Sequence, residues 1–300
     1  MDLRPLGATS LLVSPIGLGT VKLGRNRAVK YPGGDGFPLP DDARVDALFT
    51  AAADLGVNLI DTAPAYGHSE QRIGEAMRRG SWFGGRDRWI LCTKAGEEFN
   101  NDTGESRFDF SPEAVRASVQ RSMRRLHTDH LDLVLLHSDG RDEWIIEHSG
   151  ALEVLRELTR MGVIRAFGVS AKTVDGGLLA VRRADPRRVD DPAGSACGVI
   201  MVTYNPRERD AAIVIDAAAY RSIGVLVKKA FGSGHIAESA ARVPVDLRNP
   251  AASPADSLIR FALARPGVSS AVIGTTDPAH LKAAVDASRS ANPPQDAAGL

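Results

Sequence analysis

The sequence predicts an α/β protein folded as a (β/α)8 TIM barrel, and three observations lead to this prediction. Short apolar runs rich in β-branched residues alternate with amphipathic helical segments, an order typical of a parallel sheet. This unit occurs eight times along the chain. No linker rich in proline, serine or charge divides the units. We therefore expect residues 1–300 to form a single barrel domain rather than an open sheet split into two domains.

The eight expected strands share one feature, a short apolar run that follows a helical segment or a turn. They are Ile16–Gly19, Val57–Ile60, Trp89–Thr93, Leu131–Leu136, Ile164–Val169, Gly198–Val202, Val225–Val227 and Ser270–Ile273. Residues Arg4–Val13 precede the first unit with two apolar pieces around Gly7 and Ser10. We expect these pieces to form a short N-terminal β-hairpin that closes the floor of the barrel.

Several helices begin at a pair of residues that can cap a helix. In Ser111-Pro112, Ser253-Pro254 and Asp277-Pro278, an oxygen-bearing side chain precedes a proline that has no amide proton to leave unpaired. Pro40-Asp41 is a further predicted start. Apolar residues follow both Pro40-Asp41 and Ser111-Pro112 at i, i+3, i+4 and i+7, so two amphipathic helices are expected there.

Two glycines are expected to end helices in the left-handed conformation. Gly162 follows the predicted helix Leu152–Met161, and Gly224 follows the predicted helix Ile213–Arg221. Glycine is favoured at such positions because it has no Cβ atom to clash.

The composition argues against several classes of protein. Thirty-seven Lys and Arg balance 37 Asp and Glu, so no net field attracts nucleic acid or an anionic membrane. The two cysteines, Cys92 and Cys197, argue against a disulfide framework and suit a reducing compartment, so we expect a cytoplasmic protein. Prolines and glycines interrupt the uncharged stretch Pro5–Val21, which predicts neither a membrane span nor a signal peptide. The histidines show no metal-ligand spacing, so no metal is expected.

Four polar residues follow strands at the end of a barrel where active sites are built. Asp61 follows the second strand, Tyr66 lies in the loop after it, Lys94 ends the third strand and His137 ends the fourth. Each alone is a weak signal, because a lone strand-end Asp or His is more often structural. Together they predict a catalytic cluster.

The four residue types suit proton transfer to a substrate oxygen. A buried Lys94 needs a compensating carboxylate, and Asp61 on the adjacent strand can supply it. The ammonium group would then lower the pKa of Tyr66 and let the phenol donate a proton. His137 would orient or polarise the substrate oxygen.

The short sequence motifs around these residues resemble those of the aldo-keto reductase family, and the resemblance extends over most of the chain. They are Gly17-Leu18-Gly19-Thr20, Asp61-Thr62-Ala63-Pro64-Ala65-Tyr66-Gly67, Thr93-Lys94, Leu135-Leu136-His137 and Gly168-Val169-Ser170. The resemblance implies a nicotinamide-dependent oxidoreductase that reduces an aldehyde or ketone to an alcohol, or catalyses the reverse. It also implies Tyr66 as proton donor, Lys94 and Asp61 tuning it, and His137 fixing the carbonyl.

The resemblance also implies cofactor-binding positions, some of which depart from the family. Ser170 matches the serine that binds the nicotinamide carboxamide. Three other positions differ from the residue that many members have: Met201 replaces a Gln, Lys228 replaces an aromatic residue and His280 replaces an Arg. Ala171 and Ala284 both stand where many members have Asn. The other implied positions are Gly19, Thr20, Phe231, Gly232, Gly234, Gly274, Thr275 and Thr276. NADP(H) is weakly favoured, because Gly274–Thr276 contains no acidic residue to repel a 2′-phosphate; NAD(H) is the alternative.

Other interpretations stay open at this point. The Gly232–Ala237 segment matches a G-x-G-x-x-A pattern, but it follows the seventh strand rather than opening a βαβ unit, so it does not predict a Rossmann fold. A non-catalytic nicotinamide-binding regulatory barrel is one alternative function. A lyase that uses Lys94 to form a Schiff base is another, and a paired Asp61 argues against it. The resemblance implies that the substrate is a small carbonyl compound or alcohol. The basic segment Lys22–Lys30 either frames a polar or acidic substrate or forms a solvated lid.

Overall fold

The computed structural model describes residues 1–80, 84–184, 198–238 and 253–289. Cys92 is a buried free cysteine in a barrel strand. The expectation for Cys197 lies outside the described residues. No helix in the described ranges is long and apolar enough to cross a lipid bilayer.

Eight parallel strands close into a barrel, which confirms the predicted fold class. In chain order, and in spatial order around the barrel, they are β3 (Ile16–Gly19), β4 (Leu59–Asp61), β5 (Ile90–Ala95), β8 (Leu131–His137), β9 (Ile164–Ser170), β10 (Val199–Thr203), β11 (Gly224–Lys228) and β12 (Val268–Gly274). The expected strand at Val57 begins two residues later, because the Val57 amide donates to the Ala52 carbonyl and closes the preceding helix.

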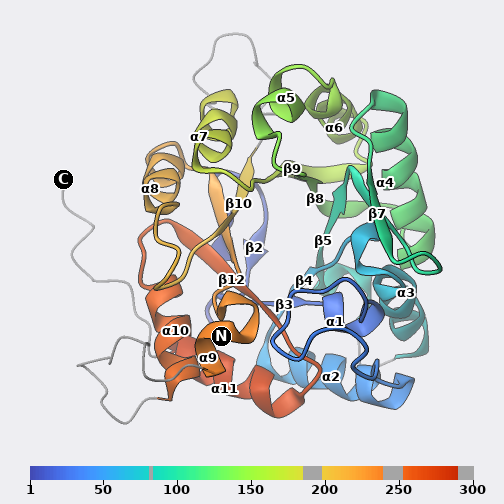
Figure 1. Ribbon diagram of the computed structural model, residues 1–300, viewed down its shortest axis with the longest axis vertical. Coiled ribbons are helices and arrows are strands. Elements are labelled where there is room, and N and C mark those ends of the chain that lie inside the picture. The colour runs from blue at the N-terminus through green and yellow to red at the C-terminus, as the bar shows by residue number, and fades with distance from the viewer. Residues whose placement is uncertain (81–83, 185–197, 239–252, 290–300) are drawn as a thin grey trace.

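Helices surround the strands in a ring (Figure 1). The longer helices are α2 (Asp42–Leu55), α3 (Ser69–Arg79), α4 (Pro112–Leu126), α6 (Ala151–Arg160), α7 (Val174–Arg183), α8 (Ala212–Tyr220), α10 (Pro254–Leu263) and α11 (Pro278–Arg289). Shorter pieces lie in the connections: α1 (Val21–Gly24), α5 (Asp142–Glu147), α9 (His235–Glu238) and the 3-10 turns η1 (Pro64–Tyr66), η3 (Arg86–Arg88) and η4 (Gly232–Gly234).

The predicted helix starts are confirmed by their caps. Asp41 accepts from the Arg44 amide at α2, and Ser111 accepts from the Ala114 amide at α4. Ser253 forms a capping box with Asp256 at α10. These contacts satisfy amide groups that have no partner within the first turn of the helix.

One of the two predicted helix-ending glycines is wrong. Gly162 has φ of 74° after α6, as expected. Gly224 is instead the first residue of β11, and Ser222 adopts the left-handed conformation with φ of 56°. Gly224 is needed for packing, since a Cβ atom there would lie 2.7 Å from the Leu6 side chain.

The N-terminal hairpin lies where the sequence predicted it. Its strands are β1 (Arg4–Pro5) and β2 (Leu12–Val13), which pair antiparallel. Leu6, Leu11 and Val13 are buried in one cluster with inward-facing residues of the barrel strands, including Leu133 and Met201. The hairpin therefore plugs one end of the barrel and leaves the other end for the loops that follow the strands.

A second hairpin was not predicted. After β5 the chain forms β6 (Glu97–Asn100) and β7 (Glu105–Phe108), which pair antiparallel beside the barrel mouth. Its sequence is mostly polar, so it lacks the apolar run by which the barrel strands were recognised. Gly96 starts it with φ of 103°, and a Cβ atom there would lie 2.1 Å from the Phe110 ring.

Candidate active site

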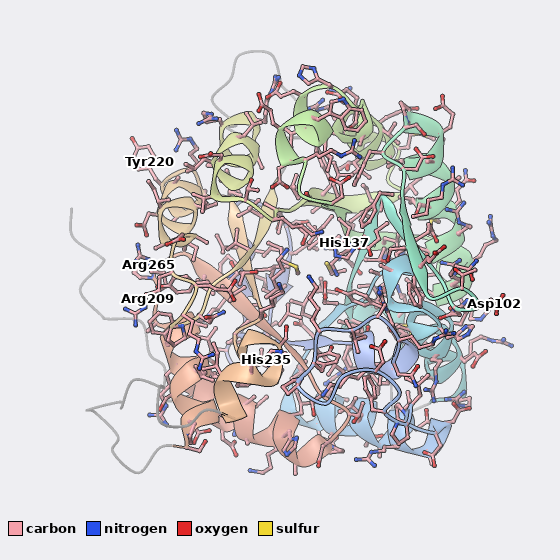
Figure 2. The ribbon with its side chains drawn as sticks, in the orientation of Figure 1. Asp102, His137, Arg209, Tyr220, His235 and Arg265 are labelled. Atoms are coloured by element: carbon pink, nitrogen blue, oxygen red, sulfur yellow. The ribbon has the colours of Figure 1, made fainter. Side chains whose placement is uncertain are left out.

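The predicted catalytic residues converge at the carboxyl ends of neighbouring strands. Asp61 is the last residue of β4, Lys94 lies near the end of β5, and His137 is the last residue of β8. Figure 2 shows His137 toward the middle of the ring of helices, whereas Asp102, in the turn of the β6–β7 hairpin, lies at its periphery. The parallel barrel brings together residues that are distant in sequence.

Lys94 and Asp61 form the predicted buried ion pair. Lys94 Nζ lies 2.7 Å from Asp61 Oδ1 and donates a second hydrogen bond of 2.9 Å to the Thr62 carbonyl. The two side chains are only 1% and 5% exposed. Burial lowers the pKa of Lys94, but Asp61 and Tyr66 outweigh that effect and raise the pKa. Lys94 is therefore a fixed positive charge at neutral pH.

Tyr66 lies against both Lys94 and His137. The Lys94 ammonium is 4.7 Å from the centre of the Tyr66 ring. The rings of Tyr66 and His137 pack edge to face, with their centres 6.1 Å apart and an angle of 85° between their planes. The four residues named from the sequence thus form one cluster.

The pKa of Tyr66 differs from the expectation. Burial raises this pKa, and Asp61 raises it further, while Lys94 lowers it. The contribution of Lys94 has the predicted sign, but burial is larger and the net pKa lies above its usual value. The phenol is therefore fully protonated at neutral pH and can act as a hydrogen-bond donor to a substrate oxygen.

Close backbone packing positions the Tyr66 loop. A Cβ atom on Gly67, whose φ is 64°, would lie 2.2 Å from the Gly24 carbonyl oxygen, and one on Gly24 would lie 2.1 Å from the Ser69 amide. Arg25 donates a hydrogen bond of 2.8 Å to the Ala65 carbonyl. Glycines at these two positions let α1 pack directly on η1, which holds Tyr66 at the barrel mouth.

Two residues of this region were missed by sequence reasoning. Glu97 is on β6, and its Oε2 lies 2.9 Å from Nδ1 of the His137 ring. Arg44 on α2 donates a hydrogen bond of 3.3 Å from Nε to the Thr276 carbonyl. Glu97 falls outside the barrel strands, and Arg44 falls on a helix face, so neither follows a recognisable strand end. Only the fold brings them to the site.

Two of the predicted nicotinamide-binding residues, Ser170 and Lys228, contact each other. Lys228 Nζ donates hydrogen bonds of 2.8 Å to Ser170 Oγ and 2.9 Å to the Ala171 carbonyl. Ser170 is completely buried, whereas Lys228 keeps partial exposure. Burial, with the charges of Lys229 and Lys94, lowers the pKa of Lys228 to about 7. Lys228 thus places its ammonium group against Ser170, at the position where the resemblance implied an aromatic ring.

Three other predicted cofactor positions differ in accessibility. Met201 is 1% exposed and belongs to the cluster inside the barrel. Thr20 is completely buried, and its hydroxyl donates to the Asp61 carbonyl. Gly19 is the last residue of β3 and is paired with Gly274 of β12. The side chains of Met201 and Thr20 are therefore buried beneath the barrel mouth and do not line its surface.

The loop after β12 partly uses its own amide groups. The Thr275 hydroxyl accepts from the Asp277 amide, and Asp277 Oδ1 accepts from the Ala279 amide. The amide groups of Asp277 and Ala279 therefore already have hydrogen-bond partners within the loop. His280 is exposed on α11, while Thr276 lies beside Arg44. Arg44 therefore brings a positive charge to the Thr276 carbonyl in the loop after β12.

The segment around Phe231, Gly232 and Gly234 packs against the long loop after β3. His235 Nε2 lies 3.2 Å from the Lys30 carbonyl oxygen, and a Cβ atom on Gly234 would lie 3.1 Å from Pro32. Phe231 is partly buried against the core. The two loops thus meet beside the mouth.

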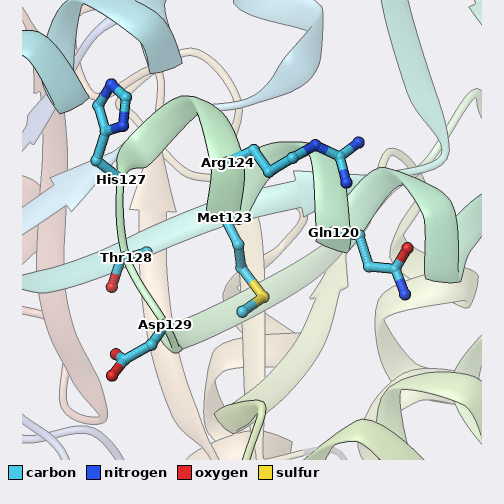
Figure 3. Close-up of a pocket in the computed structure, with 6 residues that line it drawn as sticks. All are labelled: Gln120, Met123, Arg124, His127, Thr128 and Asp129. Carbon is cyan, nitrogen blue, oxygen red and sulfur yellow. The ribbon is translucent and has the colours of Figure 1, made fainter.

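A surface pocket lies away from this cluster. Figure 3 shows it at the carboxyl end of α4 and the turn into β8, which is the end of the barrel opposite the catalytic residues. It is lined by Gln120, Met123, Arg124, His127, Thr128 and Asp129. The described residues hold no group of three or more His, Cys, Asp or Glu side chains placed to bind a metal ion.

Comparison with known proteins decides the family. The profile of the aldo/keto reductase family matches residues 15–244. A chain of known structure from Pseudomonas aeruginosa, assigned to the aldo-keto reductases, is 43% identical to this one. The alignment covers 96% of this chain and 95% of that chain, with a TM-score of 0.77. The chain belongs to the aldo-keto reductase family.

Two characterised relatives of this aldo-keto reductase are dehydrogenases. D-arabinose 1-dehydrogenase of Saccharomyces cerevisiae is 37% identical over 139 residues, which is 45% of this chain and 39% of the yeast enzyme. D-threo-aldose 1-dehydrogenase of a Pseudomonas species is 28% identical over 255 residues, which is 77% of this chain and 70% of that enzyme. The match therefore spans about two fifths of the yeast enzyme's length. Aldo-keto reductases use nicotinamide cofactors.

Proposed function

We propose that this aldo-keto reductase transfers a hydride between a nicotinamide cofactor and a small carbonyl compound or the corresponding alcohol, with Tyr66 as proton donor in the reductive direction. The observation that carries this proposal is the contact of Lys94 with both Asp61 and Tyr66 at the barrel mouth. A buried ammonium that is held by a carboxylate and faces a phenol is suited to proton transfer at a substrate oxygen.

The residues at the mouth fit a nicotinamide dinucleotide. Lys228 keeps polar hydrogens and partial exposure, so it can donate to a carboxamide oxygen. A Cβ atom on Gly274 would have only two atoms within 4 Å, at 3.8 and 3.9 Å, so space is open there for a ligand. Thr276 and Arg44 offer a hydroxyl and a positive charge to a phosphate. The nicotinamide, when bound, supplies or accepts the hydride.

The residues of this chain have separate roles in that reaction. Tyr66 donates its proton to the oxygen that becomes an alcohol. Lys94 stabilises the resulting phenolate, and Asp61 keeps Lys94 charged in its buried position. His137 lies beside Tyr66 and orients the substrate. The buried Tyr66 site disfavours a free phenolate, so transfer of the proton must be coupled to the bound substrate.

The two alternative functions are less well supported. A Schiff-base lyase needs a neutral amine, whereas Asp61 raises the pKa of Lys94 and keeps it charged. A regulatory barrel that only binds nicotinamide needs none of the contacts that join Lys94, Asp61 and Tyr66.

The finer parts of the proposal concern cofactor and location. We favour NADP(H) over NAD(H) because Arg44 and Thr276 lie together at the loop after β12. A cytoplasmic location fits the two cysteines and the balanced charge. We also propose that residues 1–300 act as one domain that needs no nucleic acid or membrane partner.

The test is cofactor titration followed by turnover. NADPH and NADH are titrated by fluorescence, and each complex is then mixed with a panel of aldehydes and ketones while cofactor oxidation is followed. Oxidation that depends on aldehyde supports the enzyme. Tight cofactor binding without oxidation by any carbonyl compound would favour the regulatory barrel, and absence of binding would overturn both.

A further inference from the structure

Lys228 places an ammonium group at the barrel mouth without a carboxylate to balance its charge. Its Nζ donates hydrogen bonds of 2.8 Å to Ser170 Oγ and 2.9 Å to the Ala171 carbonyl, and both acceptors are uncharged. Among the described residues, no carboxylate accepts a hydrogen bond from Lys228 or forms an ion pair with it. Lys94, in contrast, has the Asp61 carboxylate 2.7 Å away. The two cations of the mouth therefore differ in how their charge is balanced.

The strand register places Lys228 near the residues of the proposed reaction. Ser170, which accepts from Lys228, is the register partner of His137 on the neighbouring strand β8. Neighbouring strands lie about 4.8 Å apart. The His137 ring in turn packs edge to face on the ring of Tyr66. A short series of neighbours thus joins the ammonium of Lys228 to the phenol, and no step in it passes through the Lys94–Asp61 pair.

The surroundings of Lys228 make its ammonium group easy to deprotonate. Burial lowers the pKa of Lys228 most, and the charges of Lys229 and Lys94 lower it further, to about 7. Asp142 on α5 and Asp61 on β4 act in the opposite direction but do not offset these effects. Lys228 therefore changes from a cation to a neutral amine as pH rises through neutrality.

Three other groups near Lys228 keep their charge state when pH rises above 6.5. Burial lowers the pKa of His137 below its usual value, so its ring is largely neutral in this range. Burial raises the pKa of Tyr66, and the phenol stays protonated. The pKa of Lys94 is raised by Asp61 and Tyr66, so its ammonium stays charged. A change in charge at this side of the mouth between pH 6.5 and 9 is therefore assigned to Lys228.

The charge of Lys228 affects the two redox states of a nicotinamide differently. The oxidised nicotinamide ring carries a positive charge, whereas the reduced ring carries none. Hydride transfer requires this ring to lie beside the substrate carbon whose oxygen contacts Tyr66, which is the end of the barrel that holds Lys228. A protonated Lys228 there repels the oxidised ring and leaves the reduced ring unaffected, because two like charges repel strongly in a partly buried site.

We propose that Lys228 determines which redox state of the cofactor this chain prefers: its ammonium, balanced only by the uncharged Ser170 and Ala171 oxygens, disfavours the oxidised nicotinamide relative to the reduced one. The inference rests on the proposed use of a nicotinamide cofactor and adds a preference that the proposed function does not specify. Protonation of Lys228 favours retention of the reduced cofactor and release of the oxidised one. Deprotonation of Lys228 removes this preference.

The first test measures the protonation of Lys228 in the absence of substrate. Carbon-13 shifts of the lysine Cε atoms are followed in the full chain between pH 5.5 and 10, and the Lys228 signal is assigned with the Lys228→Gln variant. Because coupling between two binding events is reciprocal, the pKa of Lys228 should be lower in the NADP+ complex than in the NADPH complex. The phosphates are common to both complexes and cancel in this comparison. The same Lys228 pKa in the two complexes would overturn the proposal.

The second test measures the dissociation constants of NADP+ and NADPH by calorimetry at pH 6.5 and 9, and uses NAD+ and NADH if that pair binds more tightly. With a pKa of about 7, about three quarters of Lys228 is charged at pH 6.5, so its repulsion can change the ratio of the two constants by at most about fourfold. We expect the ratio of oxidised to reduced to be about threefold higher at pH 6.5 than at pH 9.

Three variants assign this dependence to the charge of Lys228. Lys228→Gln keeps a hydrogen-bond donor without the charge, and its ratio should be the same at both pH values. The control Lys172→Met removes an exposed cation next to Ala171 and should keep the wild-type dependence. If Lys228→Gln does not fold, Lys228→Arg, which stays charged, should keep a high ratio at pH 9 as well. A wild-type dependence that persists in Lys228→Gln, or that Lys172→Met abolishes equally, would overturn the role of Lys228.

The outcomes separate this inference from the function on which it rests. If the cofactors bind but no carbonyl compound or alcohol reacts, the proposed function fails, while the dissociation constants still decide the role of Lys228. If a carbonyl compound is reduced but the ratio of the constants does not depend on pH in the wild type, the function stands and the inference about Lys228 is wrong. If neither cofactor pair binds, both fail.

Discussion

Lys94 Nζ lies 2.7 Å from Asp61 Oδ1, and the same ammonium lies 4.7 Å from the centre of the Tyr66 ring. One buried cation thus contacts both a carboxylate and a phenol. The contact with Asp61 keeps Lys94 charged, and the contact with Tyr66 lets this charge act on the phenol. Substitutions of these residues should therefore separate effects on stability from effects on turnover.

Tyr66→Phe should keep the fold and the cofactor affinity and lose about 10²–10⁴-fold in kcat, because only the hydroxyl that carries the proton is removed. Steady-state kinetics and fluorescence titration measure the two effects. Tyr220→Phe, on the outer surface of α8, is the control and should retain full activity. A Tyr66→Phe enzyme with more than half of the wild-type rate would remove Tyr66 from the mechanism.

Lys94→Met should lose turnover as Tyr66→Phe does, and should also lose about 3–5 kcal/mol of unfolding free energy, because Asp61 is left buried without a partner. Urea unfolding measures this loss. The double variant Lys94→Met with Asp61→Asn should recover part of the stability but no activity. Lys282→Met removes an exposed pair with Asp286 and should cost less than about 1 kcal/mol. Unchanged stability in Lys94→Met would show that water compensates the charge of Asp61.

Lys228→Met should increase stability most in acid. The pKa of Lys228 falls from 10.5 to about 7 on folding, so between these values the unfolded chain binds more protons than the folded one. The resulting penalty is complete below pH 7 and disappears as pH rises through 10.5. The stability of Lys228→Met relative to the wild type should therefore decrease between pH 6 and 10, as measured by urea unfolding. A difference independent of pH would contradict the lowered pKa.

Arg44→Ala should weaken NADPH binding several-fold and leave NADH binding unchanged, because only NADPH carries the phosphate that Arg44 and Thr276 can bind. In the wild type we expect a preference for NADPH of about tenfold or less, since an exposed phosphate gains little from such contacts. If His280 contributes, the preference should grow at pH 6 and shrink at pH 8, and His280→Ala should flatten this dependence. Equal dissociation constants for the two cofactors would defeat the assignment to NADP(H).

The sequence predicted most of the barrel because its elements depend on local patterns. Apolar runs predicted every barrel strand, and Ser111-Pro112 and Ser253-Pro254 predicted helix starts from capping chemistry alone. Gly224 was misinterpreted because its requirement is a contact with Leu6, which lies far away in the sequence. The β6–β7 hairpin was missed because its polar strands carry no pattern of burial.

The sequence by itself determined the strand-end positions of Asp61, Lys94 and His137, because strand ends in a parallel barrel share one face. Only the tertiary structure determined the pKa values of the groups at this site and the further residues that contact them. Burial raises the pKa of Tyr66 more than Lys94 lowers it. Lys228 donates a hydrogen bond to Ser170. Glu97 contacts His137 from a hairpin that lies outside the barrel. The effect of desolvation on a pKa depends on how many atoms surround the group in the folded protein. Local sequence patterns do not predict that number, nor do they predict contacts between residues that are distant in the sequence.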